Sequence, residues 1–213
     1  MKPRLTIYNK PWHDGNDKCV GILLIVRHIN IHTFQVVAPL VTEVKCGLKI
    51  AVYDDGTVPQ PFHLSFVLNK GIDYLVEDKR VEYVSWIHDD MYFMHDWVTP
   101  LISELEADKS IGKIGPVNPV LKQTEGHKGN QNPWIMPRNI ALKYRFDEIY
   151  IGIGGFEDWD LNSCLERDGY KVWISPVTWV AHKDRGTRRY HDWSVEEAHN
   201  KKIYDMRWGG KRW

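Results

Sequence analysis

Short apolar runs alternate along this chain with segments in which apolar positions recur every three or four residues. The runs are rich in β-branched residues, which is typical of strands buried on both faces of a sheet. They predict strands at residues 21–27, 48–53, 81–87, 111–117, 172–174 and 177–180. The helical spacing predicts helices at residues 31–45, 61–76, 96–107, 158–167 and 194–206. Strands and helices that alternate in this way predict an α/β layered fold with a mainly parallel sheet.

A further segment, residues 122–133, is rich in Gly, Asn, Gln and Lys and lacks either period. We expect an exposed loop there, and a loop of this length in a compact domain is often a lid or a binding loop. Because the chain has 213 residues, a single domain is its simplest organisation.

The charge balance limits the possible partners. Lys and Arg together number 28, as do Asp and Glu, so the formal net charge is zero. This argues against a grip on nucleic acid by the whole protein surface, although residues 201–213 form a local basic patch.

Cysteine usage and hydropathy indicate a cytoplasmic protein. Cys19, Cys46 and Cys164 lack the spacing of a metal or redox motif and are interpreted as free thiols in a reducing compartment. The longest apolar run, residues 19–26, is too short to span a bilayer. The first residues also lack the apolar stretch of a signal peptide.

Acidic residues follow two of the predicted strands. Asp54 and Asp55 come after the second strand, and His88, Asp89 and Asp90 come after the third. Because ligands of such sheets bind at the carboxyl ends of the strands, these groups are expected at one edge. Carboxylates suit Mg²⁺ or Mn²⁺, and Mn²⁺ also accepts an imidazole. A polar turn is the alternative for either cluster taken alone.

A second acidic cluster begins the helix expected near residue 158. Glu157 and Asp158 stand in its first turn, where acids also complement the helix dipole, so their presence alone is weak evidence of function. Asp158 shares a helical face with Leu161 and Leu165, which predicts that it points toward the core. A charge on that side indicates a functional role, such as that of a base.

Other candidates are individually weaker. His182 follows an apolar segment and precedes a basic stretch that includes Arg185, which could neutralise a diphosphate or be a solvated loop. Trp134 and Trp159 could pack on sugar rings, and core packing is an equally good interpretation of both.

These motifs, in the order VYDDGT, WIHDDM and GGFEDWDLNSCLERDGYKVWISPVTWVAH, resemble the family-2 glycosyltransferases with the A-type nucleotide-sugar (GT-A) fold. The resemblance covers roughly residues 20–190. It implies a three-layer α/β domain over residues 1–213, with a nucleotide-binding part at about 20–120 and an acceptor and catalytic part at about 121–190. Residues 191–213 would form a helical basic tail.

The resemblance also implies roles for particular residues. Asp158 would be the catalytic base, supported by Glu157. The metal, Mn²⁺ or Mg²⁺, would be held by Asp90, His182 and His88, although the family often has Asp or Asn at the position of His88. The nucleotide-sugar donor would be bound by Asp54, Asp55, Asp89, Arg27 and Arg185. Arg27 stands where the family commonly has Thr-Tyr-Asn, so this chain departs from the usual contacts to the base.

The implied activity is an inverting transfer of a sugar from a nucleoside-diphosphate sugar, with a UDP-sugar favoured. The acceptor hydroxyl would belong to a glycan, a lipid-linked sugar or a modified nucleic acid. Three alternatives remain: a nucleotidyltransferase of related fold, a His-Asp metal phosphohydrolase, and a non-catalytic module that binds sugar or nucleic acid. Release of pyrophosphate would indicate a nucleotidyltransferase, and a helical setting for the His-Asp pair would indicate a phosphohydrolase. Strongly salt-dependent binding of nucleic acid would indicate a binding module.

Overall fold

The computed structural model of the chain describes residues 1–8, 19–26, 29, 31–54, 62–119, 133–152, 155–182 and 194–210, apart from the side chain of His32. Its strands are β1 (Leu5–Tyr8), β2 (Cys19–Ile25), β3 (Gly47–Tyr53), β4 (Val81–His88), β5 (Met91–Tyr92), β6 (Ile111–Val117), β7 (Trp134–Pro137), β8 (Lys171–Trp179) and β9 (Ala181–His182). Its helices are α1 (Ile31–Glu43), α2 (Leu64–Val76), α3 (Val98–Ala107), α4 (Arg138–Lys143), α5 (Glu157–Arg167) and α6 (Ser194–Trp208).

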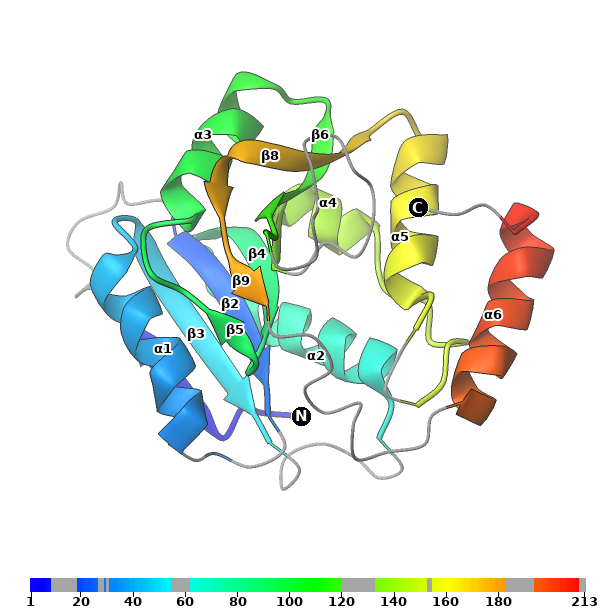
Figure 1. The fold of residues 1–213 in the computed structure, drawn as a ribbon, viewed down its shortest axis with the longest axis horizontal. Helices are drawn as coiled ribbons and strands as arrows, with labels where there is room; N and C mark the ends of the chain where they lie inside the picture. Colours follow the sequence, from blue (N-terminus) through cyan, green and yellow to red (C-terminus); the bar gives the residue numbers. More distant parts are fainter. Residues whose placement is uncertain are drawn as a thin grey trace.

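Seven strands form one sheet in the order β1-β3-β2-β4-β7-β6-β8, and β5 pairs with β9 in a small second sheet (Figure 1). Strand β2 runs parallel to β3 and β4, and β6 runs parallel to β8. Strand β7 is antiparallel to both β4 and β6, so these two strands point the same way. The mainly parallel sheet expected from the sequence is therefore confirmed.

Helices cover both faces of the large sheet and give three layers. Helices α1 and α3 pack on one face, around side chains such as Leu40 and Leu101. Helices α2, α4 and α5 pack on the other, around Leu68, Ile140 and Leu165. Strands buried on both faces in this way need continuous apolar sequences, which is why β2 and β3 were recognisable as strands.

The helix boundaries follow local capping. Helix α2 begins later than expected, at Leu64, where Nδ1 of His63 accepts a hydrogen bond of 3.3 Å from the amide of Phe66. Oδ1 of Asp96, two residues before the first residue of α3, accepts hydrogen bonds from the amides of Val98 and Thr99 and so satisfies two donors at the start of this helix. Strands β1, β5, β7 and β9 and helix α4 are additions that the apolar pattern did not predict, and the two strands expected at residues 172–174 and 177–180 belong to the single strand β8. The added elements are short, and short elements give little periodic signal.

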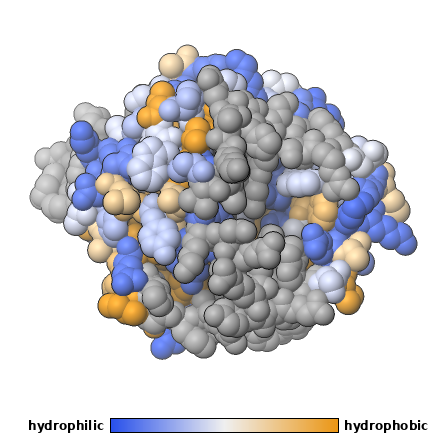
Figure 2. Space-filling model, in the orientation of Figure 1, coloured by the Kyte–Doolittle hydropathy of each residue, from blue (hydrophilic) through white to orange (hydrophobic). Residues whose placement is uncertain are grey.

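The face of the molecule drawn in Figure 2 carries both hydrophobic and hydrophilic residues. In the view of Figure 2, the hydrophobic residues among the coloured atoms form small groups separated by hydrophilic ones. In the part of the chain that the structure describes, no helix combines the length and the apolar character needed to cross a membrane.

Candidate active site

Three strand ends define one edge of the sheet. Ile25, the last residue of β2, is level with Tyr53 of β3 on one side and with His88 of β4 on the other. Asp54 and Asp89 therefore follow strand ends that flank the end of β2. This register brings Asp54 and Asp89 to the same edge, as the sequence led us to expect.

The small second sheet adds His182 to this edge. Its strands pair antiparallel so that Met91, next to Asp90, is opposite His182. Nε2 of His182 lies 2.9 Å from Oδ1 of Asp90. The His88 ring stacks on that of His182, with ring centroids 5.5 Å apart and planes inclined by 9°. His88, Asp90 and His182 therefore form one cluster, although they come from β4, the turn after it and β9.

The electrostatics of the cluster keep its carboxylate charged. Burial raises the pKa of Asp90, but the close contact with His182 and the electrostatic influence of His88 and His182 lower it, so that the pKa lies below its usual value. Asp90 is therefore an ionised, largely enclosed carboxylate, which is the form that binds a cation.

The cluster fits part of a divalent metal site. Two cis ligands of an octahedral ion at about 2.1 Å lie about 3 Å apart, close to the observed 2.9 Å between Asp90 and His182. Within the described ranges, no three carboxylate, imidazole or thiol groups make a complete metal-binding set. Mg²⁺ is commonly held by one or two carboxylates together with substrate phosphates and water, so an incomplete protein set suits a metal that arrives with a nucleotide.

The second acidic cluster lies at the same edge. Helix α5 precedes β8 and leads into its amino end, so the helix begins at the edge where the parallel strands finish. Phe156, directly before the helix, has a left-handed backbone with φ of 74°, the only positive φ among the described non-glycine residues. Such a conformation is strained, persists only where neighbours enforce it, and is often found at functional sites.

The orientation expected for Asp158 needs correction. The fully buried acids of this turn are Glu157 and Asp160, with 4% and 3% of their surfaces exposed, whereas Asp158 is half-buried. From the sequence we expected α5 to have a single buried face. Helix α6 packs on a second side of α5 and buries Asp160 there. A half-exposed carboxylate remains accessible to a substrate, which suits a base better than an inward one.

Lys113 lies close enough to Asp158 and Glu157 to interact with their charges, and the sequence did not lead us to expect it there. Its side chain is fully buried in β6, and its Nζ donates a hydrogen bond of 2.9 Å to Oδ1 of Asn162 in α5. Burial lowers the pKa of Lys113 to about 8, against the opposing charges of Asp158 and Glu157. The available signal was a single cation inside the apolar run of β6.

The two candidate tryptophans are packed against protein. Trp134 is 1% exposed and lies edge-on to Trp86 with ring centroids 6.5 Å apart. Trp159 packs edge-on against Phe156 and Tyr204. The structure thus favours core packing for Trp134, and for Trp159 a contact with α6.

The remaining candidates are distributed as follows. Asp54 is buried at the end of β3, with its Oδ2 3.8 Å from Nε of Arg4. Arg27, Asp55, Arg185 and residues 122–132 of the expected binding loop lie outside the described residues. In the basic tail, Arg207 is engaged by Asp147 and Asp160 and is therefore not a free basic group.

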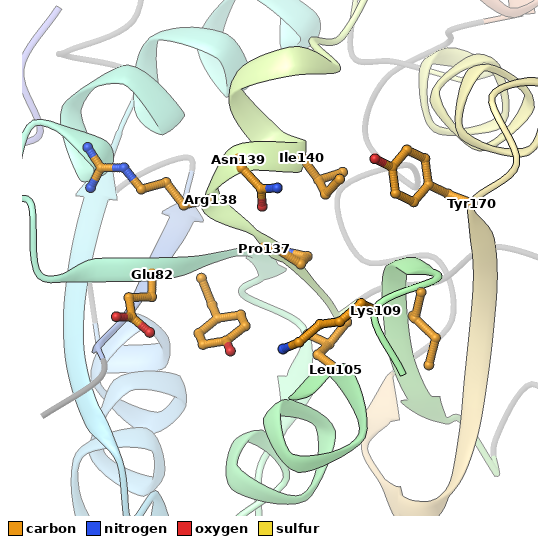
Figure 3. Close-up of a pocket in the computed structure, with 10 residues that line it drawn as sticks. Glu82, Leu105, Lys109, Pro137, Arg138, Asn139, Ile140 and Tyr170 are labelled. Atoms are coloured by element: carbon orange, nitrogen blue, oxygen red, sulfur yellow. The ribbon is translucent and has the colours of Figure 1, made fainter. Parts of the chain in front are cut away.

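A cavity of about 460 Å³ lies at the opposite edge of the sheet, beside the first residues of β4 and β6 (Figure 3). Its lining includes Glu82, Lys109 and Arg138. The guanidinium of Arg138 binds the backbone carbonyl groups of Val76, Asp78 and Val81, so this cation has a structural role. The cavity is therefore separate from the acidic edge.

No family model and no curated protein matches this sequence, but solved structures do. Glucosyl-3-phosphoglycerate synthase from Mycobacterium tuberculosis, in complex with Mg²⁺ and UDP, is 14% identical with a TM-score of 0.61, covering 92% of this chain and 81% of its own. The mannosyltransferase PcManGT from Pyrobaculum calidifontis, in complex with GDP-Man and Mn²⁺, is 14% identical with a TM-score of 0.66, covering 96% and 69%. GalNAc-T7 with UDP, GalNAc and Mn²⁺ is 10% identical with a TM-score of 0.55, covering 82% and 45%.

These similarities define the class of the fold. The chain has the GT-A nucleotide-sugar transferase fold, as the sequence motifs led us to expect.

Proposed function

We propose that this protein is a metal-dependent glycosyltransferase that moves a sugar from a nucleoside-diphosphate sugar to an acceptor hydroxyl. The observation that carries the proposal is the contact between Asp90 and His182 at the carboxyl edge of a GT-A sheet. The similar synthase and mannosyltransferase were solved with a nucleotide and Mg²⁺ or Mn²⁺. These neighbours support a UDP-sugar or a GDP-sugar as the donor.

Asp90 and His182 would hold Mg²⁺ or Mn²⁺, with His88 stacked behind His182. When bound, the metal would neutralise negative charge on the leaving diphosphate. Asp54 and Asp89, at the neighbouring strand ends, are the described candidates for contacts to the nucleotide. Arg27, Asp55 and Arg185 are further candidates for binding the donor.

Asp158 would act as the general base, with Glu157 buried beside it. Its carboxylate takes the proton of the acceptor hydroxyl while the acceptor oxygen forms a bond to the anomeric carbon. The bond from that carbon to the diphosphate oxygen breaks, and the electron pair leaves with the diphosphate. Attack from the face opposite the leaving group inverts the anomeric centre, through an oxocarbenium-like transition state.

The proposal is tested in two stages. A thermal-shift screen of UDP-sugars and GDP-sugars with Mn²⁺ identifies the donor, because a ligand that binds only the folded state raises its apparent stability. The nucleotide product is then identified after incubation with the donor and a panel of glycan, lipid-linked and nucleic-acid acceptors. Release of nucleoside diphosphate, lost on addition of EDTA, supports the proposal. Release of pyrophosphate, or no binding of any nucleotide sugar, would refute it.

A further inference from the structure

The start of α5 is held in place by the carboxyl-terminal helix. Helix α6 lies beside α5 at the outside of the molecule (Figure 1). Two of its residues, Asn200 and Tyr204, have no exposed surface. The ring of Tyr204 packs against Phe156 and Trp159, on either side of Glu157 and Asp158 in the sequence.

Asp160 is the main point of attachment. Its Oδ1 accepts hydrogen bonds of 2.9 Å from Arg207, 2.7 Å from Nε1 of Trp208 and 3.0 Å from the hydroxyl of Tyr150. Arg207 also pairs with Asp147 at 2.8 Å. A carboxylate only 3% exposed, with these three donors, is strongly held in one position.

The strained residue before the helix is enclosed by the same element. The ring of Phe156 lies against Tyr204, with centroids 5.6 Å apart, and against Trp159. The hydroxyl of Tyr204 is 3.1 Å from that of Ser163, also in α5. The carbonyl of Phe156 accepts the hydrogen bond of the Asp160 amide, at 2.8 Å. Phe156, with its left-handed backbone, and Asp160, which α6 holds in place, thus flank Glu157 and Asp158 in the sequence.

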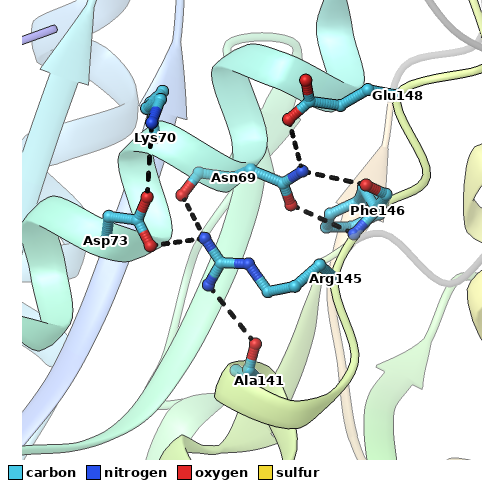
Figure 4. Close-up of polar contacts among 7 residues, drawn as sticks. All are labelled: Asn69, Lys70, Asp73, Ala141, Arg145, Phe146 and Glu148. Atoms are coloured by element: carbon cyan, nitrogen blue, oxygen red, sulfur yellow. Dashed lines mark hydrogen bonds and ion pairs between the residues drawn. The ribbon is translucent and has the colours of Figure 1, made fainter.

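The chain that leads to this turn is fixed from both sides. On one side, the side chain of Asn69 in α2 exchanges hydrogen bonds with the backbone of Phe146, and Arg145 binds Asp73 (Figure 4). On the other, the amide of Asn200 in α6 binds both the N–H and the C=O of Ile151. The approach to α5 is therefore tied to α2 and to α6.

We propose that α6 is a positioning element that sets the place of Asp158 by anchoring Asp160 through Arg207 and Trp208. The proposal rests on the function proposed above for Asp158. It also gives the basic carboxyl-terminal helix a task within the protein, because Arg207 is engaged with acids of the same chain. Arg207 and Trp208 are positioning residues and do not themselves contact a reacting group.

The test compares two substitutions at the anchor with one elsewhere on the same helix. Arg207→Met and Trp208→Phe each remove donors to Asp160. Lys201→Met removes a cation that pairs with Asp205 within α6 and serves as the matched control. Arg207→Lys, which retains the charge, is the conservative variant. Amide hydrogen exchange is followed in peptides over residues 155–161 and over β2 and β4.

Arg207→Met should speed exchange over residues 155–161 by roughly tenfold or more, because charge-assisted hydrogen bonds are lost, while exchange in β2 and β4 is unchanged. Trp208→Phe should have the same effect to a smaller degree, Arg207→Lys should partly restore the wild-type rate, and Lys201→Met should match it. Unchanged exchange over residues 155–161, or an equal increase in all peptides, would overturn the proposal.

Where the wild-type protein transfers sugar, Arg207→Met should lower kcat by roughly tenfold to a hundredfold with KM for the donor unchanged, because the base is displaced while the nucleotide edge is intact. A fall in thermal stability with an unchanged kcat would show that α6 only stabilises the fold. Absence of transfer by the wild-type protein would refute the proposed function, and hydrogen exchange would still decide whether α6 positions α5.

Discussion

Nε2 of His182 lies 2.9 Å from Oδ1 of Asp90, although Asp90 follows β4 and His182 belongs to β9. The pairing of β5 with β9 creates this contact, because Met91 is opposite His182. It joins two motifs that are far apart in the sequence into one group with a carboxylate and an imidazole.

Removal of either member of the pair should weaken metal binding. In Asp90→Asn and in His182→Ala, we expect the affinity for Mn²⁺ in the presence of UDP to fall at least tenfold, because loss even of outer partners of a metal typically costs tenfold to a hundredfold. Isothermal titration calorimetry measures this directly. Asp108→Asn is the control, because Asp108 pairs with Lys171 at the opposite edge. Wild-type affinity in both site variants would exclude this pair as the metal ligands.

Loss of the proposed base should separate catalysis from binding. Asp158→Asn keeps the size of the side chain but removes its ability to accept a proton. We expect kcat to fall by on the order of a hundredfold or more, the usual scale for general-base catalysis, with an unchanged dissociation constant for the donor. Glu166→Gln, near the other end of α5, is the control. Full activity of Asp158→Asn would disprove the assignment.

The buried Lys113 should make stability depend on pH. Its pKa is about 8 in the folded protein against an ordinary 10.5, so between these values the unfolded chain binds more protons. The free energy of unfolding contributed by this group should therefore rise with pH from about 8 to about 10.5. Across that range, the total gain is roughly 3 kcal/mol. Below pH 8, the full cost of burying the charge is present.

Urea denaturation at several pH values measures this effect as a difference from Lys113→Met. The substitution leaves in place Glu157 and Asp158, the carboxylates that act on Lys113. We expect wild-type stability to rise relative to that of Lys113→Met between pH 8 and pH 10. A difference that stays constant over this range would show that Lys113 keeps an ordinary pKa.

A close contact between α2 and β2 should make one glycine intolerant of a methyl group. A Cβ at Gly71 would lie 2.5 Å from Cδ2 of Leu23, which is fully buried. Alanine gains up to about 1 kcal/mol of helix propensity, but overpacking typically costs about 1–3 kcal/mol. We expect Gly71→Ala to lower the free energy of unfolding by roughly 1 kcal/mol. Lys70→Ala, at the exposed neighbouring position, should change it by less than about 0.5 kcal/mol.

The acidic edge was predictable because it depends on local patterns. The apolar runs that became β3 and β4 each end directly before their acids, and parallel strands must finish at the same edge. The start of α5 was predictable for the same reason. The burial of Asp160 and the role of Arg207 were not, because both depend on α6 packing beside α5.

The sequence by itself determined the alternation of strands and helices, the layered α/β class and the acids at the strand ends, because each of these depends on residues close together in the chain. Only the tertiary structure decided that His182 meets Asp90, that Lys113 is buried near Asp158, and that Trp134 belongs to the core. Such contacts join residues from separate elements. They depend on the order of the strands in the sheet and on which side chains are brought together when two layers pack.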